Sequence, residues 1–595
     1  MNNGPPRSWV PTYAMSANSD LFVKVATFHQ NKIDQYVTCV MQASDQYAST
    51  GSITYAAFNL VGRPTHFPNM GDFADTYLTS RYGNWWLQLP SAGEEFGLQN
   101  VPDNLKPSDS YILCCFDDNV YPLELEACET LSAGAIQKVW MRTTMNTETR
   151  HTRWALLWDR AVDPLENIDS TNAAIRNPFT IKLRQLHEPG QTLMIELNHR
   201  DLDYHAGLDS IMLKGGTDPP VYIPCPLNLS RQQEDQHQII SQNNSSTRID
   251  QLPEELLFGI FQYLDLMSLA RVARVCTRFQ QTAQDSCLYF EINLRPYWMM
   301  TSPQLYNWVS KRAKLCRKLN VSWNTDSDRQ LAMELLSLLR ACCNTLTHLR
   351  MSYNAAVTED LLQVVFQNCP KLQELSIDGR CSEDRYPFVI GPGVLTNLVR
   401  LNLADSGWLD TSMLLQIVSQ SPNLKHLNIN FCNSLALPEL FELLGNNNHQ
   451  LISLNAVKAG TLTSEALCCL AGCTQLQELD VGWTFQELNW QTEHLRTLLI
   501  ACPMIKKLFM SAARDLQDND LFSIAGACSM LEQLSLVGCN NISARGIQQV
   551  LEHCKNLKLL DISHCEGIEH ESVLAWQNTY GTEIKRIQPT HNIDG

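Results

Sequence analysis

Apolar residues in the second half of the chain recur with a fixed period. An L-x-x-L-x-L pattern starts at positions 316, 346, 372, 398, 424, 451, 476, 505, 531 and 557, and a half-copy runs from Ile584 to Ile587. Each pattern predicts a short strand, and residues at helical spacing follow it. One strand and one helix cannot bury so much apolar surface, whereas stacked units can. We therefore expect residues 298–595 to form an α/β leucine-rich-repeat solenoid, a horseshoe with about ten repeats of a cysteine-containing type.

A second apolar pattern precedes the repeats, in the stretch LPEELLFGIFQYL. It begins at Leu252, and its large apolar residues fall on one stripe of a helix. Two shorter helical patterns follow, so that residues 249–297 predict a small three-helix unit. A unit of this size keeps much of its surface exposed. Its excess apolar side chains must therefore contact either the first repeat or another protein.

Residues 21–222 show a different pattern, with short apolar or alternating runs such as SYILCCF, RWALLWD and TLMIELN between turn-rich stretches. This pattern predicts an all-β sandwich. Trp85, Trp86, Trp154 and Trp158 are candidates for a ligand surface, although sandwich tryptophans are more often buried in the core. A tail over residues 1–20 and a polar linker over residues 223–248 complete the predicted multidomain organisation.

The amino-acid composition excludes several classes of protein function. The 44% hydrophobic and 18% charged content is that of a globular protein. A formal net charge of −17 argues against nucleic acid as a partner, because the phosphates would be repelled. The chain shows no apolar run long enough for a transmembrane helix, and its first twenty residues do not read as a signal peptide.

The 21 cysteines follow the repeat rather than a metal-binding or disulfide spacing. Several stand three residues before a repeat pattern, as Cys528 and Cys554 do, and others three residues after one, as Cys432, Cys539 and Cys565 do. No C-x-x-C occurs, and no nucleophile motif or phosphate-binding loop is found. We expect small buried thiols, no metal, no cofactor and no enzyme activity.

Sequence detail resolves the helical unit. The stretch LPEELLFGIFQYLDLMSLARVARVCTRF resembles the F-box motif almost position by position. F-boxes bind the Skp adaptor of a cullin-RING (SCF) ubiquitin ligase, which brings a cullin, a RING subunit and a ubiquitin-conjugating enzyme. The resemblance implies that the adaptor-facing or supporting residues are Leu252, Pro253, Leu256, Leu257, Ile260, Phe261, Leu264, Leu269, Val272, Val275, Cys276 and Phe279. Phe279 departs from the motif, where many F-boxes have tryptophan.

The order of the predicted domains, together with two stretches of the sandwich, resembles a more specific family. GDFADTYLTSRYGNWWLQLPS and LDYHAGLDSIMLKG are similar to the discoidin-like domain of the F-box and leucine-rich-repeat protein 4 family. That family implies a mitochondrion-associated substrate receptor that restrains mitophagy by promoting turnover of outer-membrane mitophagy receptors. Its Arg-rich, apolar N-terminal segment has no evident counterpart here, so a cytoplasmic or nuclear location is the alternative. A plain interaction scaffold and a glycan- or lipid-binding sandwich are the rival functions.

Alternation along each predicted strand selects the residues that face away from the core. We expect a protein substrate to bind this concave strand face, with Trp483 on its rim. The selected residues are His348, Arg350, Arg400, Asn402, His426, Asn428, Asn430, Glu478, Asp480, Trp483, Lys507 and Phe509.

Overall fold

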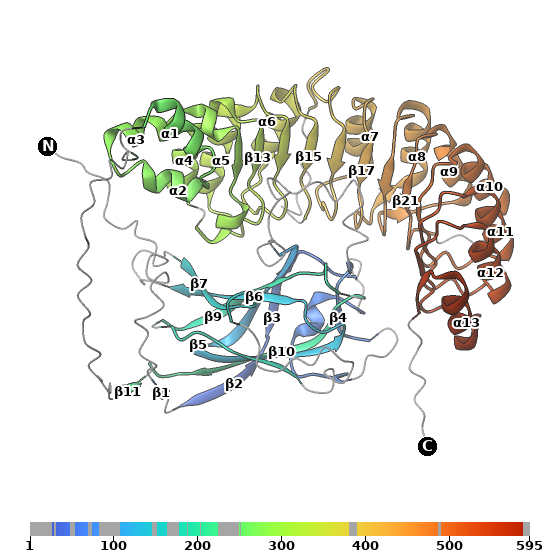
Figure 1. The fold of residues 1–595 in the computed structure, drawn as a ribbon, viewed down its shortest axis with the longest axis horizontal. Coiled ribbons are helices and arrows are strands. Elements are labelled where there is room, and N and C mark those ends of the chain that lie inside the picture. Colours follow the sequence, from blue (N-terminus) through green and yellow to red (C-terminus); the bar gives the residue numbers. More distant parts are fainter. Residues whose placement is uncertain are drawn as a thin grey trace, which may run out of the picture.

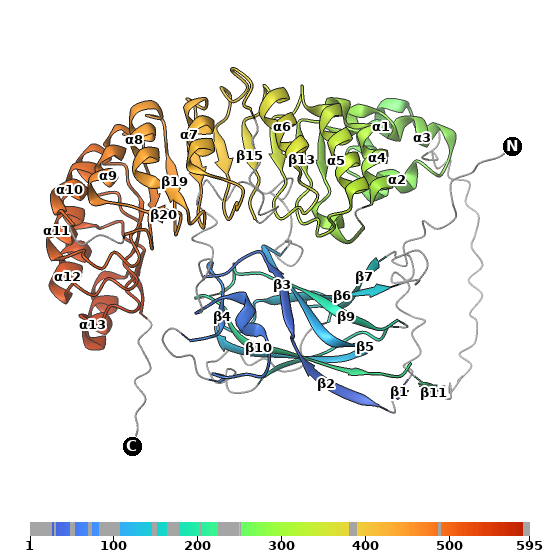
Figure 2. The ribbon, with the colours of Figure 1, turned by 180° about the vertical axis from the view of Figure 1, so that it is seen from behind.

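A computed structural model shows the fold of the chain. It describes residues 26–28, 31–47, 54–68, 74–82, 108–144, 152–163, 178–186, 188–202, 204–219, 221–223, 249, 252–300, 302–379, 389–485 and 490–586. Trp85, Trp86, the predicted tail and most of the predicted linker lie outside these residues. Figures 1 and 2 show a curved solenoid with its helices on the outside and a β-sandwich on its concave side.

The N-terminal part is an antiparallel β-sandwich, as predicted. Its strands are β1 (Ala26–Phe28), β2 (Lys32–Tyr36), β3 (Cys39–Ala43), β4 (Tyr77–Leu78), β5 (Ser110–Leu131), β6 (Ile136–Thr144), β7 (Thr152–Asp159), β8 (Phe179–Lys182), β9 (Gly190–Leu197), β10 (Gly207–Gly216) and β11 (Val221–Ile223). The long strand β5 belongs to both layers. Its first half pairs with β3 and β9, and its second half pairs with β10 and β8. The sequence suggested two separate strands here, because exposed residues at positions 117–119 interrupt the apolar pattern.

The helical unit comprises α1 (Glu254–Phe261), α2 (Leu266–Val272) and α3 (Thr277–Ala283). Asp265 caps α2, because its carboxylate accepts a hydrogen bond from the Ser268 amide at 2.6 Å. Phe261 and Phe279 pack edge to face with ring centroids 5.5 Å apart. These side chains join the same continuous apolar core as the solenoid, so the helical unit is packed directly onto the first repeats.

The solenoid contains a parallel sheet of 12 strands. They are β12 (Glu291–Asn293), β13 (Lys318–Asn320), β14 (His348–Arg350), β15 (Glu374–Ser376), β16 (Arg400–Asn402), β17 (His426–Asn428), β19 (Ser453–Asn455), β21 (Glu478–Asp480), β22 (Lys507–Phe509), β23 (Gln533–Ser535), β24 (Leu559–Asp561) and β25 (Glu583–Lys585). A strand occupies the third to fifth residues of every predicted pattern, and β25 occupies the predicted half-copy. Strand β12 was missed, since it lies inside the segment assigned to the helical unit.

Helices cover the outer side of this sheet (Figure 1). They are α4 (Pro303–Ser310), α5 (Arg329–Cys342), α6 (Glu359–Asn368), α7 (Thr411–Ser419), α8 (Leu437–Asn447), α9 (Ser464–Cys469), α10 (Thr492–Ala501), α11 (Asp518–Ala527), α12 (Ala544–His553) and α13 (His570–Tyr580). A small sheet of β18 (Leu435–Ala436) and β20 (Gly460–Thr461) accompanies them. In the part of the chain that is described, no helix is both long and apolar enough to span a bilayer.

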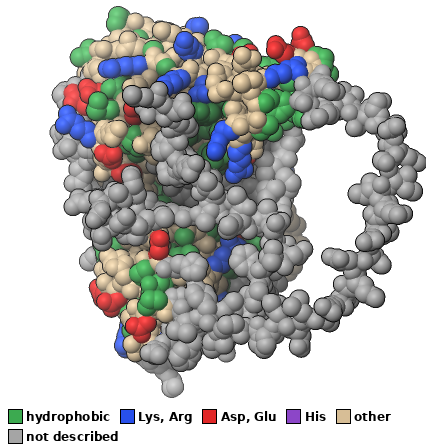
Figure 3. Space-filling view, turned by 90° about the vertical axis from the view of Figure 1, so that its left-hand side faces the viewer, with side chains coloured by type: hydrophobic (Ala, Val, Ile, Leu, Met, Phe, Trp, Pro, Cys, Tyr) green, Lys and Arg blue, Asp and Glu red, His purple; other side chains and the backbone are tan. Residues whose placement is uncertain are grey.

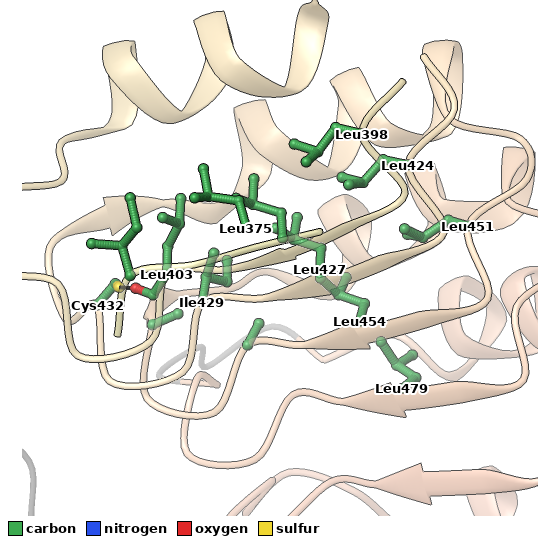
Figure 4. Packing of buried hydrophobic residues seen from close by; sticks show 14 of the residues in the cluster. Leu375, Leu398, Leu403, Leu424, Leu427, Ile429, Cys432, Leu451, Leu454 and Leu479 are labelled. Atoms are coloured by element: carbon green, nitrogen blue, oxygen red, sulfur yellow. Dashed lines mark hydrogen bonds between the residues drawn. The ribbon is translucent and has the colours of Figure 1, made fainter. Parts of the chain in front are cut away.

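The solenoid core is a ladder of leucines. Each strand places its middle residue inward, so that Leu427, Leu454 and Leu479 lie in register on neighbouring strands (Figure 4). The periodic cysteines complete this ladder. The Cys432 thiol donates to the Leu403 carbonyl of the preceding repeat at 3.1 Å, and Cys565 repeats the contact with the Leu536 carbonyl at 3.1 Å. Burial raises the pKa of both thiols to about 12, so they stay neutral and link successive repeats.

A tight turn ends most of the strands. The last strand residue is often Asn or Asp, whose side-chain oxygen accepts a hydrogen bond from the amide two residues later, as in Asn428, Asn455 and Asp561. Three residues after ten successive strands, β13 to β24, the backbone is left-handed. The residues at these positions are Trp323, Tyr353, Gly379, Asp405, Phe431, Lys458, Trp483, Ala512, Gly538 and His564. Only two of them are glycine, although this conformation costs other residues about 1–2 kcal/mol.

Candidate functional site

The first candidate site is an exposed apolar surface on the helical unit. Leu256 and Ile260 of α1 are 55% and 40% exposed, and Val275, just after α2, is 67% exposed. Tyr263, which the sequence analysis did not select, is 91% exposed. Figure 3 views the molecule from this end and shows hydrophobic side chains among acidic and basic ones. Several large apolar side chains left open to water on one small unit indicate an interaction surface. We call Leu256, Ile260, Tyr263 and Val275 the F-box surface.

The other residues of the predicted set divide by burial. Pro253 and Cys276 are exposed beside the F-box surface, whereas Leu252, Leu264 and Val272 are half-buried against the core. The residues that the structure buries are Leu257, Phe261, Leu269 and Phe279. These four cannot touch an adaptor while the unit is folded, and they act as support by fixing the three helices against each other.

The second candidate site, the concave strand face, is covered by the β-sandwich. At one end, Trp140 and Trp154 of the sandwich pack edge to face on Trp298, with centroids 5.7 and 5.3 Å apart. At the other end, the Tyr82 hydroxyl donates to Asp561 Oδ2 of β24 at 3.1 Å. Trp154 and Trp158 are both buried, so neither forms a free ligand surface. The sandwich therefore contacts the arc from its first repeats to its last ones.

The left-handed turn residues supply much of this contact. Trp323 and Tyr353 pack edge to face on Tyr111 of β5, with centroids 5.3 and 5.9 Å apart, and the Tyr353 hydroxyl donates to the Ser44 carbonyl. We call the left-handed residues that contact the sandwich, Trp323, Tyr353, Lys458 and Trp483, the docking row. The left-handed backbone conformation of these residues is energetically unfavourable, and their packing against the sandwich offsets this cost.

The Lys458 side chain contacts the sandwich through both a hydrogen bond and an aromatic ring. Its Nζ donates to the Tyr47 carbonyl of the sandwich and lies 4.7 Å from the Tyr47 ring and 5.0 Å from the Trp483 ring. Cation–π contacts of this kind favour the charged amine. Burial nevertheless lowers the pKa of Lys458 to about 7, because the desolvated ammonium is costly.

This packing changes the expectation for the predicted substrate residues. His426, Asn428, Glu478, Lys507 and Phe509 are buried, so they do not present an open face. The remaining ones are half-buried: His348, Arg350, Arg400, Asn402, Asn430, Asp480 and Trp483. Trp483 contacts Tyr47 at a centroid distance of 5.9 Å and is therefore not a free rim residue. A substrate role for these residues stays a prediction, and the sandwich covers the face on which they lie.

Several of these polar residues have structural tasks that the alternation pattern does not reveal. Asn402, Asn428 and Asp480 accept the turn hydrogen bond described above. Lys507 pairs with Glu478 of the adjacent strand at 2.8 Å. Such groups are polar because the turn or the neighbouring strand requires a partner.

A buried cluster in the sandwich has the residue types of a catalytic triad. His199 Nδ1 lies 3.0 Å from Asp109 Oδ1, and its Nε2 lies 3.4 Å from Ser110 Oγ. Although desolvation acts to lower it, the pKa of His199 is raised by Asp109 and Asp45. Ser110 and His199 are both buried and, among the described residues, have no path to a substrate. We therefore assign the cluster a structural role, in which the His199 ring is paired with Asp109 inside the sandwich.

Comparison with known proteins identifies the helical unit and a relative that is similar over most of the chain. The F-box-like family model matches residues 249–295. F-box/LRR-repeat protein 4 of Bos taurus is 29% identical over 521 residues, which cover 83% of this chain and 82% of that protein. This chain is similar to F-box/LRR-repeat protein 4 over most of its length and has an F-box-like domain at residues 249–295. The predicted resemblance is thereby confirmed, and the architecture described above confirms the predicted fold class.

Two solved structures are similar to parts of the chain. The crystal structure of the Rad7 and Elc1 complex in yeast has 14% identity and a TM-score of 0.33, and the match covers 56% of this chain and 92% of that one. CBM32-3 from a family 31 glycoside hydrolase of Clostridium perfringens has 12% identity and a TM-score of 0.18, covering 30% and 89%. At these scores the likenesses carry no conclusion.

Proposed function

We propose that the chain is the substrate-recognition subunit of an SCF ubiquitin ligase and that its F-box surface binds a Skp-type adaptor. The exposed row of Leu256, Ile260 and Val275 beside a well-packed helical core is the observation that carries this proposal. An amphipathic helix that presents i, i+4 apolar anchors is a recurring mode of partner binding. The match of an F-box-like model to residues 249–295 supports it.

A receptor of this kind is non-catalytic. Its F-box end engages the ligase, and the sandwich with the solenoid holds the substrate. Tethering raises the effective concentration of the substrate lysine near the ubiquitin-loaded conjugating enzyme, so the attack on the thioester becomes nearly intramolecular. The contacts between sandwich and solenoid make these two domains one substrate-facing body, because the Tyr82–Asp561 hydrogen bond and the docking row connect them along the arc.

The test is a double variant, Leu256→Ala with Ile260→Ala. Because both side chains are exposed, the fold should persist while adaptor binding is lost. Each leucine-sized side chain contributes about 1.5–3 kcal/mol when fully buried, and roughly half of each is still open, so we expect a total loss of about 1.5–3 kcal/mol for the two. That corresponds to roughly 10- to 150-fold weaker binding, measured by calorimetry with purified adaptor.

A matched control is Leu315→Ala, which removes another exposed leucine (39% exposed) outside the F-box. It should leave adaptor affinity unchanged. Adaptor binding at wild-type strength by the double variant would show that the F-box surface is misassigned. Co-purification of a cullin with the wild type from cells with blocked neddylation, but not with the double variant, would separate the ligase from a plain scaffold.

We further propose that the substrate is a mitophagy receptor of the mitochondrial outer membrane, as the family resemblance implies, and that the protein acts at mitochondria. Support for this finer proposal comes from the relative's extent, since the similarity covers 83% of this chain. Loss of the protein should raise the level of such receptors and increase mitophagy, measured with a pH-sensitive mitochondrial reporter. Re-expression of the double variant should not reverse the effect.

A further inference from the structure

A cavity of about 480 Å³ lies between the sandwich and the concave face. This volume is in the range of small-molecule sites, which bury a ligand between two walls. Arg81 and Arg200 line the cavity from the sandwich, and Arg350, Glu374 and Arg400 line it from the solenoid. The cavity is thus enclosed by two domains that are connected by the docking row.

The solenoid wall of this cavity places two arginines around one carboxylate at strands β14 to β16. Arg350 places both Nε and Nη2 on Glu374 Oε1, at 2.8 and 2.7 Å. Arg400 approaches only the other oxygen of the same carboxylate, and its Nη1 remains 3.8 Å away. Two guanidinium groups therefore share one carboxylate in a chain whose overall charge is −17.

His426 lies next to Arg400, because the two residues are register partners on β16 and β17. The imidazole is 6% exposed, and its Nδ1 has no hydrogen-bond partner among the described residues. Burial first, and then the charges of Arg400 and Lys425, lower the pKa of His426 to about 4. A buried ring nitrogen without a protein partner, beside an arginine that shares its carboxylate, is a polar arrangement that requires an explanation.

Asp378 adds a second carboxylate to this wall, and Arg81, Arg200 and Arg295 add positive charge from elsewhere in the cavity lining. Asp378 accepts a hydrogen bond from Ser376 Oγ at 2.8 Å, and Asp109 is paired with the His199 ring at 3.0 Å. The remaining acidic residues of the cavity, Asp480 and Asp561, belong to β21 and β24 at the other end of the arc.

We propose that this wall, centred on Arg350 and Arg400 with His426 beside Arg400, is a binding site for a small polyanion, a metabolite that carries phosphate or several carboxylates. Guanidinium groups bind both kinds of oxyanion through paired, charge-assisted hydrogen bonds. The surrounding protein strengthens such contacts relative to water. Because Arg81 and Arg200 line the opposite wall, a bound anion would bridge the sandwich and the solenoid and stabilise their docking.

The experiment uses the full chain in complex with its adaptor and two probes, pyrophosphate and citrate. Calorimetry and thermal unfolding are measured against sodium chloride of equal ionic strength. One or both probes should bind and raise Tm beyond the chloride control, and the preferred probe identifies phosphate or carboxylate chemistry. Arg400→Gln should weaken binding at least tenfold, since it removes a charge-assisted contact of about 1.5–3 kcal/mol.

Arg496→Gln is the matched control, because Arg496 is 57% exposed on α10 and lies outside the cavity lining. It should leave probe affinity unchanged. His426→Gln is a second variant that removes the imidazole without changing the charge, and it should also weaken binding if Arg400→Gln proves unstable. The proposal is overturned if neither probe binds or raises Tm beyond the chloride control. It is also overturned if both Arg400→Gln and His426→Gln bind the probes as tightly as the wild type does.

Discussion

The substitution Trp323→Gly tests whether the docking row joins the sandwich to the solenoid. Trp323 is left-handed, with φ 72°, and belongs to an apolar cluster shared by the two domains. Arg295 lies 4.1 Å above its ring, and Tyr111 packs against its edge. Truncating a buried tryptophan costs about 3–5 kcal/mol, whereas glycine relieves about 1–2 kcal/mol of backbone cost. The docked state should lose about 2–3 kcal/mol.

Hydrogen exchange followed by mass spectrometry measures this loss locally. Peptides that contain the docking loop Ser44–Tyr47 and the turn at Tyr353 should exchange roughly 30- to 150-fold faster, because the undocked population rises by that factor. Ala512→Gly is the control: it makes the same backbone change at φ 60° but removes only one methyl group, and it should not speed exchange at the loop. Unchanged exchange in Trp323→Gly would refute the docking role of this residue, as would faster exchange spread evenly over all the repeats.

Buried groups elsewhere give three further tests. Cys528→Ser should lower Tm more than Cys565→Ser does. At position 565 a serine hydroxyl can donate to the Leu536 carbonyl, whereas at position 528 a buried, unpaired hydroxyl costs about 1–3 kcal/mol. Equal losses of Tm in thermal scans would contradict this. Leu257→Ala should destabilise the F-box by about 2–5 kcal/mol, so its loss of adaptor binding should appear together with a lower Tm, unlike that of the surface variant. Burial lowers the pKa of His205 to about 3, so the folded state binds fewer protons than the unfolded chain between about pH 3 and 6.5, and stability should fall as pH drops through this window. His205→Gln should flatten that acid-side decline in Tm, and an unchanged slope would argue against it.

The repeat register could be predicted from sequence because it depends on a local pattern. A leucine that must face the core at the centre of a three-residue strand recurs with the period of the solenoid, so Leu349 and Leu375 announce β14 and β15. The same reasoning could have found β12, since Ile292 pairs with Leu319 one period later. The signal was weak because Glu291 is exposed and Asn293 half-buried beside a single inward isoleucine.

The interdomain face was beyond such reasoning. Alternation shows that Arg400, Asn428 and Trp483 point away from the core, but it does not say whether water, a substrate or another domain meets them. The left-handed turn positions hold tryptophan, tyrosine, lysine and alanine as well as glycine, so no residue type marks them along the chain. Their shared feature, the backbone conformation, becomes visible only when the repeats are stacked.

The sequence by itself determined three things about this protein: the stacking period, the three-helix F-box and the sandwich with its alternating strands. Each arises from contacts between residues close in the chain or separated by one constant period. Tertiary structure alone decided that Leu257 is core while Leu256 is surface, that the sandwich covers the concave face, and that Arg350 and Arg400 line an interdomain cavity. These outcomes depend on contacts between segments that are hundreds of residues apart in the chain. Such contacts produce no periodic pattern in the sequence of either segment.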